Sequence, residues 1–345
     1  MTLSRRALAA GIGGVALAAG LGATGIAAAG EGRGRAGRRP QTRTIRYQGS
    51  AGVVTPLELA ATLGYLADVR LEWIGNSTSG PQDIQATVTG DTDIGGAFNG
   101  AIIRLVAAGA PITSLFGYYG IDAKVWSGYY VRTDSPVRTV RDLAGRTVGA
   151  NTLGGQAEDV LRMRLRSAGL GQDVAQSAQI VVVPPVSAEQ ALRSGQLDVA
   201  VLGGVLRDTA LRRGGIRPVF NDYQVLGTFT CGCQVMRNDF IHDNPDTVRT
   251  VVAGVARAIA WSQTRPVRQV IDRFERIVRA RKRTEDAAAL QFWKGYGIAR
   301  RGGVITPREL SVWLDRLSDS GIVDRRDAPL DRLYTNRFNP YPGVA

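Results

Sequence analysis

Several short segments of the sequence carry small, hydroxyl or amide side chains that bind ligands without transforming them. Each follows an apolar stretch expected to be a strand, and open α/β sheets bind ligands at the carboxyl ends of their strands. Glycines there allow close backbone approach, and helices beginning after Thr55 and Gly155 would aim free N–H groups at a small oxyanion. The candidate ligand-binding residues are Gly49, Ser50, Asn76, Ser77, Phe98, Asn99, Asn151, Thr152, Gly154, Gly155, Gly203 and Gly204.

Simpler roles for these residues stay open at this point. The glycine pairs Gly154–Gly155 and Gly203–Gly204 could serve only as turns, and Phe98 could belong to the core. Asn76 and Ser77 are common loop residues, so each is informative only together with the others.

The titratable side chains exclude most catalytic chemistry. His242 is the one histidine and lies in a polar segment without a nucleophile motif, so a Ser-His-Asp triad and most zinc sites are excluded. Cys231 and Cys233 share one face of an expected strand, where a bridge would be strained, which favours buried reduced thiols over a disulfide. We therefore expect a binding protein rather than an enzyme, with no catalytic residue, metal or cofactor.

A pattern of glutamine, alanine, glycine and aspartate occurs twice. Gln85-Ala86-x-x-x-Gly90-x-x-Asp93 returns as Gln190-Ala191-x-x-x-Gly195-x-x-Asp198, and each copy is followed by an apolar run and glycine. The spacing predicts the same succession of elements in both copies: a helix that ends at glycine, a strand and a ligand-facing loop. Two such units predict two similar α/β lobes around a cleft.

Strand and helix patterns alternate around this repeat, which predicts a largely parallel sheet with helices on both faces. Thr55-Pro56 and Thr306-Pro307 carry helix-start signals, the second with the glutamate of a capping box. Residues 223–236 are β-prone and are expected to cross back to the first lobe. The expected strands are 44–48, 69–73, 93–98, 147–150, a buried strand at 180–183, and 198–202; the main expected helices are 57–66, 81–89, 156–168, 187–194, one beginning at 244–246, 264–278 and one beginning at 306.

The chain has 345 residues, enough for two α/β lobes, and a formal net charge of +13. The excess positive charge is concentrated in an N-terminal tail and in residues 265–283, which contain eight basic and two acidic residues. The apolar stripe Val267, Val270, Ile271, Phe274 and Ile277 places these arginines on a solvated helix face, with docking to an acidic partner or lipid as the alternative. This distribution does not predict nucleic-acid binding.

The N-terminus has the layout of an export signal. Arginines at 5 and 6 precede an uncharged Ala/Gly/Leu stretch and a small-residue cleavage region within residues 1–29, similar to a twin-arginine signal. The stretch is long enough to serve instead as an uncleaved anchor. Residues 30–43 are expected to form a basic flexible linker.

Taken in order, the motifs resemble one family. The segments that carry the resemblance are Pro56-Leu57-Glu58-Leu59-Ala60, Gln85 to Gly95, Ala108-Gly109-Ala110-Pro111-Ile112, Asp134-Ser135-Pro136, Val140 to Arg146, Asn151 to Gln156, Ala191 to Asp198, and Asn244 to Arg249. Over residues 44–320 the chain is similar to ABC-importer substrate-binding proteins of the nitrate/sulfonate/taurine type, whose relatives include thiamine-pyrimidine-synthase-like proteins.

The resemblance implies a type II periplasmic-binding fold with two lobes, 44–130 plus 230–345 and 131–229, hinged by crossover segments. It adds Thr228 to the ligand contacts and implies a monomer in the periplasm or at the outer face of the cytoplasmic membrane. The implied partners are a small-molecule ligand and the permease and ATPase subunits of an importer. The related pyrimidine synthases need several histidines, which this chain lacks.

Two ligand hypotheses remain. The first is an aliphatic sulfonate, taurine or nitrate-type anion, favoured by the neutral loops. The second is a neutral or aromatic compound such as a pyrimidine, a flavin or a thiamine precursor. Five aromatic side chains could stack on such a ligand or pack between the lobes: Tyr118, Tyr119, Trp126, Tyr129 and Tyr130.

Overall fold

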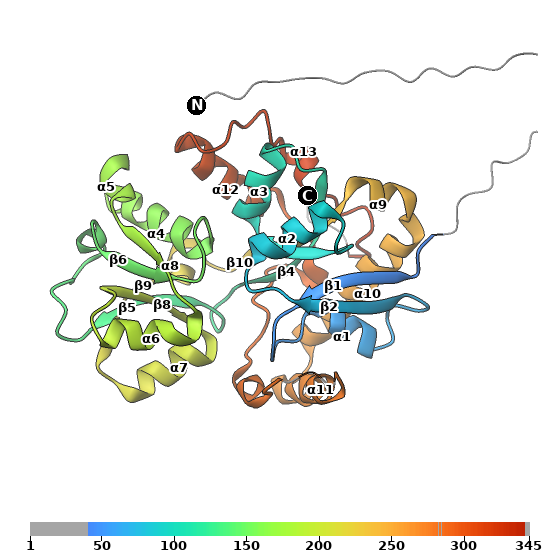
Figure 1. Ribbon diagram of the computed structural model, residues 1–345, viewed down its shortest axis with the longest axis horizontal. Coiled ribbons are helices and arrows are strands. Elements are labelled where there is room, and N and C mark those ends of the chain that lie inside the picture. Colours follow the sequence, from blue (N-terminus) through green and yellow to red (C-terminus); the bar gives the residue numbers. More distant parts are fainter. Residues whose placement is uncertain (1–40, 282, 284, 342–345) are drawn as a thin grey trace, which may run out of the picture. The chain divides into compact units, whose positions relative to one another are not determined.

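A computed structural model describes residues 41–281, 283 and 285–341 (Figure 1). The predicted export signal and all but the last three residues of the predicted linker lie outside these residues. Within the described part of the chain, no helix is long and apolar enough to cross a membrane.

The first group of strands combines a parallel and an antiparallel sheet. Strand β1 (Thr44–Gly49) pairs in parallel with β2 (Arg70–Asn76), and a bridge from Tyr47 to Ile94 joins β1 to the start of β3 (Gly95–Phe98). Strand β10 (Phe229–Arg237) is antiparallel to both β3 and β4 (Ile112–Ile121). The strand order is therefore β2-β1-β3-β10-β4, with one antiparallel strand among parallel ones.

The second sheet repeats this arrangement. Its order is β7 (Gln179–Val182), β6 (Thr147–Ala150), β8 (Val199–Gly203), β5 (Ser127–Arg132) and β9 (Ile216–Asn221). Strand β6 is parallel to β7 and β8, and β5 is antiparallel to β8 and β9. Each sheet thus contains the single antiparallel strand in the same place, which confirms the two similar α/β units predicted from the repeat.

Helices cover both faces of each sheet, as predicted. Figure 1 shows α4 and α5 on one side of the second sheet and α6 and α7 on the other. The helices are α1 (Pro56–Thr62), α2 (Gly80–Thr89), α3 (Asn99–Ala107), α4 (Gln156–Ser167), α5 (Gln172–Gln176), α6 (Pro185–Arg193), α7 (Gly204–Arg213), α8 (Asp222–Leu226), α9 (Asn238–Asp243), α10 (Pro245–Thr264), α11 (Val267–Ala280), α12 (Pro307–Asp319) and α13 (Leu330–Leu333), with 3₁₀ turns η1 (Val140–Leu143), η2 (Ala288–Phe292) and η3 (Arg301–Gly303).

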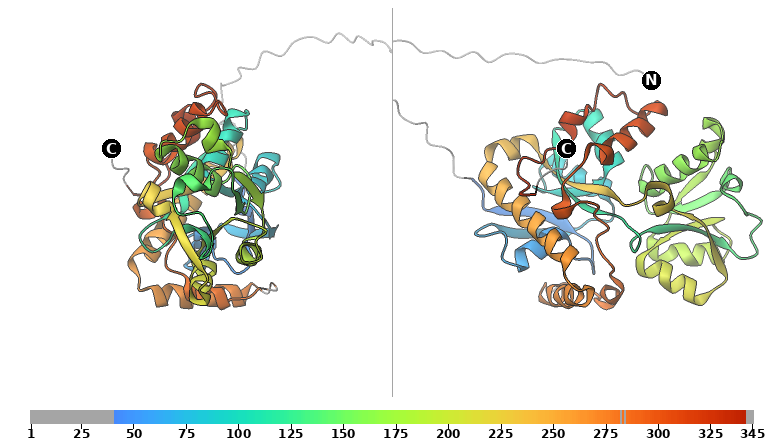
Figure 2. Two further views of the ribbon diagram at one scale, coloured as in Figure 1. Left: turned by 90° about the vertical axis from the view of Figure 1, so that its left-hand side faces the viewer. Right: turned by 180° about the vertical axis from the view of Figure 1, so that it is seen from behind.

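Two crossovers connect the sheets, as expected for the hinge. The chain leaves β4 at Ile121 to enter β5 and returns through α8 into β10, whose Phe229 pairs with Ile121 (Figure 2). The outgoing and returning segments therefore run next to each other. The predicted return through 223–236 is confirmed, with a short helix before the strand.

The repeated residues have the same structural roles in both copies. Gly90 and Gly195 adopt left-handed conformations, with φ of 84° and 78°, and stop α2 and α6. The two aspartates tie the following strand to its neighbour: the N–H of Arg46 donates to Asp93 Oδ2 at 2.8 Å and that of Thr147 to Asp198 Oδ2 at 2.9 Å. The repeat is therefore scaffold, and its aspartates set the register between neighbouring parallel strands.

The expected buried strand at 180–183 is an exposed edge strand. Strand β7 pairs only with β6 among the described strands, and Val181 and Val182 are 37% and 54% exposed. An apolar run predicts burial only when another element covers it, and the outer face of β7 is not covered. By contrast, the predicted N-cap at Thr55 and the predicted capping box at Thr306 are both present, and Thr55 also forms a capping box with Glu58.

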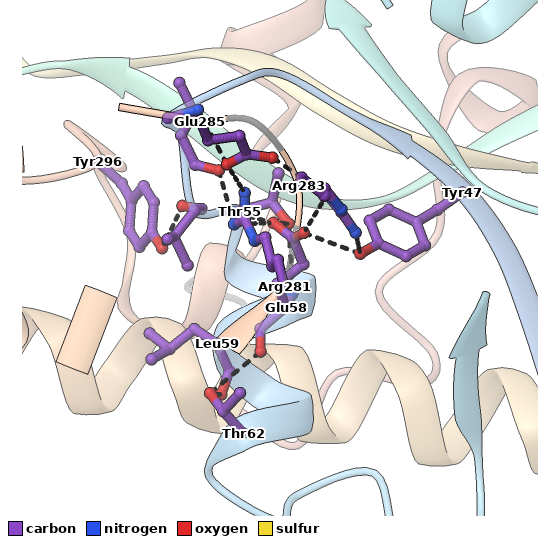
Figure 3. Close-up of polar contacts among 12 residues, drawn as sticks. Tyr47, Thr55, Glu58, Leu59, Thr62, Arg281, Arg283, Glu285 and Tyr296 are labelled. Atoms are coloured by element: carbon purple, nitrogen blue, oxygen red, sulfur yellow. Dashed lines mark hydrogen bonds and ion pairs between the residues drawn. The ribbon is translucent and has the colours of Figure 1, made fainter. Parts of the chain in front are cut away.

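The prediction that the arginines of residues 265–283 lie on a solvated helix face is wrong for Arg281 and Arg283. Arg268 and Arg279 are exposed, but the side chains of Arg281 and Arg283 are 6% and 12% exposed. They enter a buried cluster with Glu58 and Glu285 (Figure 3). The helix ends at Ala280, so helical periodicity no longer determines where these two arginines point.

Glu58 is the centre of this cluster. One carboxylate oxygen accepts from the Tyr47 hydroxyl at 2.8 Å, and the other accepts from Arg281 Nη2 and from the Thr55 N–H, each at 3.0 Å (Figure 3). Arg281 Nη1 also donates to Glu285 Oε2 at 2.9 Å. The cluster fastens the end of α11 to the start of α1 and to β1.

Replacing Glu58 with glutamine should strongly destabilise the protein, because it leaves a buried guanidinium without a full counter-charge. We expect a loss of about 3 kcal/mol in the free energy of unfolding, measured by urea denaturation. Asp272→Asn is the matched control, because Asp272 pairs with Arg268 at the surface and should change stability by less than about 0.5 kcal/mol. Equal effects of the two substitutions would contradict the buried-cluster interpretation.

Candidate functional site

A cavity of about 440 Å³ lies where residues of the first strand group and of the second sheet meet. Gly80 and Phe98 line it from the first group, while Gly149, Val201 and Gly203 line it from the second sheet. Of the residues predicted from sequence, the structure brings five together in this cavity: Phe98, Asn151, Thr152, Gly155 and Gly203.

The predicted contacts at the ends of β1 and β2 do not line the cavity. Gly49 is packed against the side chains of Arg283 and Trp73, and its carbonyl accepts from the Ser77 N–H at 2.9 Å. Ser50 and Asn76 are exposed beside them. Arg283 lies over the Trp73 ring, 4.0 Å from its centroid, so a side chain of the protein itself occupies the space in front of Gly49.

The other predicted residues lie elsewhere. Asn99 is fully buried, and its amide nitrogen donates to the carbonyls of Thr230 and Glu309 at 3.2 and 2.9 Å. Gly154, Gly204 and Thr228 line three other, separate hollows. Asn99 therefore braces β10 against α12, a role that its position after a strand did not indicate.

Six of the described helices (α2, α3, α4, α6, α7 and α8) begin at the cavity, and four of them lack a side-chain cap. Lining residues include the N-cap residues of α4 and α7, Gly155 and Gly203, and the first residue of α6, Pro185. No side chain accepts from the first-turn N–H groups of α4 and α7, whereas α2 and α8 are capped by Ser79 and Asn221. Helix α6 offers no such group at the cavity, because Pro185 has no N–H and the Ser187 N–H donates to the Pro184 carbonyl at 2.9 Å. Uncapped N–H groups and the positive ends of helix dipoles favour an anion.

The lining is otherwise aromatic and uncharged, with one exception. Phe98, Tyr118, Tyr119 and Tyr129 contribute aromatic rings, and no lysine or arginine occurs among the described residues that line the cavity. The sequence reasoning placed the tyrosines among the ligand or packing candidates but missed the exception, Asp222.

Asp222 is a buried carboxyl group in the wall of the cavity. Its Oδ1 accepts from the Ser127 N–H at 2.9 Å and its Oδ2 from Gln156 Nε2 at 3.2 Å. Burial raises the pKa of Asp222 to about 7, although these hydrogen bonds lower it in part. The only sequence signal was its position after Asn221 in a helix-capping pattern, which predicts a turn rather than a site.

Buried ion pairs hold the first turn of α4 against the first strand group. Asp159 is 1% exposed, with Arg104 Nη2 at 2.9 Å and Arg316 Nη2 at 3.6 Å. Arg104 also donates to the Gly154 carbonyl at 2.6 Å. These contacts position Gly155 and its free N–H groups at the cavity.

The described residues contain no group of three or more histidine, cysteine or acidic side chains that could hold a metal ion. Cys231 and Cys233 are both buried and unbridged, which confirms the predicted reduced thiols. Their burial raises the pKa of both thiols well above the usual value.

Comparison with known proteins assigns the chain to a family. The model of the NMT1/THI5-like family matches residues 52–269, and the chain belongs to this family. The match confirms the resemblance found in the sequence motifs. A search of curated proteins gave no match.

Solved structures with low sequence identity share the fold. The aliphatic sulphonate binding protein SsuA from Escherichia coli is 21% identical, with 84% of this chain and 92% of that chain covered and a TM-score of 0.62. The nitrate-binding protein NrtA from Synechocystis PCC 6803 is 14% identical, with 87% and 88% covered and a TM-score of 0.65. The desulfurization enzyme DSZB is 18% identical, with 86% and 97% covered and a TM-score of 0.55. The periplasmic-binding-protein fold predicted from the motifs is confirmed.

Asp222 should make stability depend on pH. Its folded-state pKa of about 7 lies above the value of about 3.9 expected in the unfolded chain, so the folded protein binds the proton more tightly. Its contribution to stability is complete below pH 4 and is lost as the pH rises through 7.

Asp222→Asn should therefore gain stability relative to the unmodified protein as the pH rises from 4 to 8, by up to about 4 kcal/mol. Thermal unfolding at several pH values measures this difference. Asp134→Asn is the control, because the Asp134 side chain is 75% exposed. The stability difference between this variant and the unmodified protein should stay constant with pH. If the stability difference between Asp222→Asn and the unmodified protein also stayed constant with pH, the raised pKa of Asp222 would be refuted.

Proposed function

We propose that the protein is an exported solute-binding protein that captures a small organic anion of the aliphatic sulfonate class and delivers it to an ABC importer. The observation that carries this proposal is the convergence of the uncapped N-termini of α4 and α7 on one cavity without a cationic side chain among its described lining residues. Backbone N–H groups bind oxyanions in this way without charged side chains. The family and the solved structures of sulfonate- and nitrate-binding proteins support it.

The size and lining of the cavity favour an organic anion over nitrate. A volume of about 440 Å³ is within the range of organic-ligand pockets. The rings of Phe98, Tyr118, Tyr119 and Tyr129 offer apolar contact area that nitrate cannot use. A sulfonate satisfies both features, with its head group at the helix N-termini and its carbon chain against the rings.

The export route and the lobes belong to the same proposal. The twin-arginine-like signal at residues 1–29 would carry the protein to the periplasm or to the outer face of the cytoplasmic membrane. There, the two lobes would close on the ligand, with Asp159 and its two arginines as part of the closing contact. The expected lobe bounds, 44–130 plus 230–345 and 131–229, shift at one point, because all of β5 (Ser127–Arg132) pairs within the second sheet. We propose that the protein acts as a monomer and binds rather than transforms its ligand.

The same aromatic rings support a second candidate, a neutral aromatic ligand such as a pyrimidine. Asp222 could then donate or accept a hydrogen bond at the ring edge. The two candidates differ in charge, so they differ in how binding depends on pH.

Isothermal titration with ethanesulfonate, taurine, nitrate, sulfate and an aminopyrimidine at pH 6 and pH 8 tests the proposal. We expect the sulfonates to bind, and to bind more tightly at pH 6, because an anion near Asp222 favours its protonated form. In Asp222→Asn the sulfonate affinity should be the same at both pH values. Binding of the pyrimidine alone would reject the anion and support the second candidate.

An aspartate at the N-cap of α4 should separate ligand binding from folding. In Gly155→Asp the new carboxylate would accept from the first-turn N–H groups and repel an anion. Gly155→Ala places the same Cβ 2.7 Å from Thr152 Cγ2 without the charge, so sulfonate affinity should fall at least 100-fold in Gly155→Asp relative to Gly155→Ala. Thr306→Asp is the control at the N-cap of α12, outside the cavity, and should leave binding unchanged. Full sulfonate affinity in a folded Gly155→Asp variant would contradict the role of this helix.

A further inference from the structure

A second cavity of about 390 Å³ lies on the other side of Tyr119. Its wall is mainly aromatic and aliphatic, and no acidic residue occurs among the described residues that line it. The apolar lining residues are Val53, Val54, Tyr119, Val125, Trp126, Val205, Phe274, Leu290, Phe292, Trp293 and Tyr296.

The two cavities share one partition. Tyr119 lines both cavities. At two further places, residues adjacent in the chain line different cavities: Ser127 and Gly203 line the first, whereas their neighbours Trp126 and Gly204 line the second. Gly204 has no other atom within 4 Å of the position that a Cβ would take, so the space beside it is open. The start of α7 therefore borders both cavities, with Val205 facing the second and Leu206 facing the first.

The far wall of the second cavity is rigidly built. Phe274, Trp293 and Tyr296 pack against one another with ring centroids 5.1 to 5.9 Å apart. The Tyr296 hydroxyl donates to the Val54 carbonyl at 3.0 Å, next to the Glu58 cluster (Figure 3). Trp126, Phe292, Trp293 and Tyr296 nevertheless stay partly exposed, and partly exposed aromatic rings around a preformed hollow are typical of a ligand site.

Lys124 and Lys294 are the cationic residues among the described residues that line the second cavity, and Arg207 lies next to the lining residue Trp126. Lys124 is exposed, and Lys294 Nζ lies 2.6 Å from Asp208 Oδ2. Arg207 stacks on Trp126, 3.9 Å from the ring centroid, and pairs with Asp208 at 2.7 Å. Asp208 thus neutralises part of this positive charge, and the mainly aromatic and aliphatic wall suits an uncharged apolar group.

We infer that the second cavity holds the apolar tail of the same ligand whose anionic head lies at the N-terminus of α7. The inference rests on the proposed function and narrows its ligand class to amphiphilic organic anions, either longer-chain alkanesulfonates or arenesulfonates. The open space beside Gly204 is the path from head to tail. A short anion fills the first cavity alone, whereas a long one reaches past Tyr119 into the second.

A homologous series tests this inference directly. Titration of the protein with methane-, butane-, hexane- and octanesulfonate and with naphthalenesulfonate, followed by calorimetry and tryptophan fluorescence, gives affinity against tail length. We expect the affinity to rise about fourfold for each methylene group that enters the second cavity. Trp126 and Trp293 line that cavity, so their emission should shift with the long sulfonates and not with methanesulfonate.

Val53→Trp is the variant that blocks the tail site. Val53 is 51% exposed at the edge of the second cavity, so a larger ring fits there without disturbing the core. The variant should bind methanesulfonate as before and lose at least tenfold in octanesulfonate affinity. Ile322→Trp, at an equally exposed position that lines neither cavity, should leave the whole series unchanged.

The outcomes separate this inference from the proposed function. Binding of short sulfonates without a gain from longer tails overturns the inference and leaves the proposed function standing. Failure of every sulfonate to bind overturns both. Binding of an uncharged aromatic probe such as indole in the second cavity, blocked by Val53→Trp but not by octanesulfonate, shows a separate ligand and also overturns it.

Discussion

The buried ion pairs of Asp159 are the contact on which the site depends. This carboxylate lies in the first turn of α4, is 1% exposed, and pairs with Arg104 from α3 and Arg316 from α12. A buried carboxylate without a counter-charge is costly, so the arginines and α4 are held together. The same turn presents the free N–H groups after Gly155, and the position of the proposed anion site therefore follows from an ion pair outside it.

In the proposed function, electrostatic contacts and apolar contacts to the ligand come from different parts of the cavities. Backbone N–H groups supply positive potential in the first cavity, where no described lining side chain is cationic. Aromatic rings supply contact area in both cavities. Asp222 adds a proton-dependent group, because burial keeps its pKa near 7 and an incoming anion favours the protonated form. Binding without charged side chains leaves selectivity to cavity shape and to the tail of the ligand.

Local patterns predicted the elements well and the side-chain directions less well. Thr55 and Thr306 cap helices as expected, and the apolar face of α10, with Val248, Val251 and Val255, is buried. Arg281 was placed on a solvated face because periodicity was extended beyond the end of α11 at Ala280. In the fold it pairs with Glu58, which is distant in sequence and close in space. Long-range pairing of this kind has no local signature.

The sequence by itself determined the repeated unit. Gly90 and Gly195 stop a helix, Asp93 and Asp198 tie one strand to the next, and the same strand order results twice. These effects act within a few residues or between neighbouring strands, so a pattern records them. The tertiary structure alone decided which loops meet: it brought Asn151, Gly155 and Gly203 to one cavity with Asp222, and it covered Gly49 with Arg283. That choice depends on how the two sheets pack through buried charges and rings from distant segments, and packing of distant segments is a property of the whole fold.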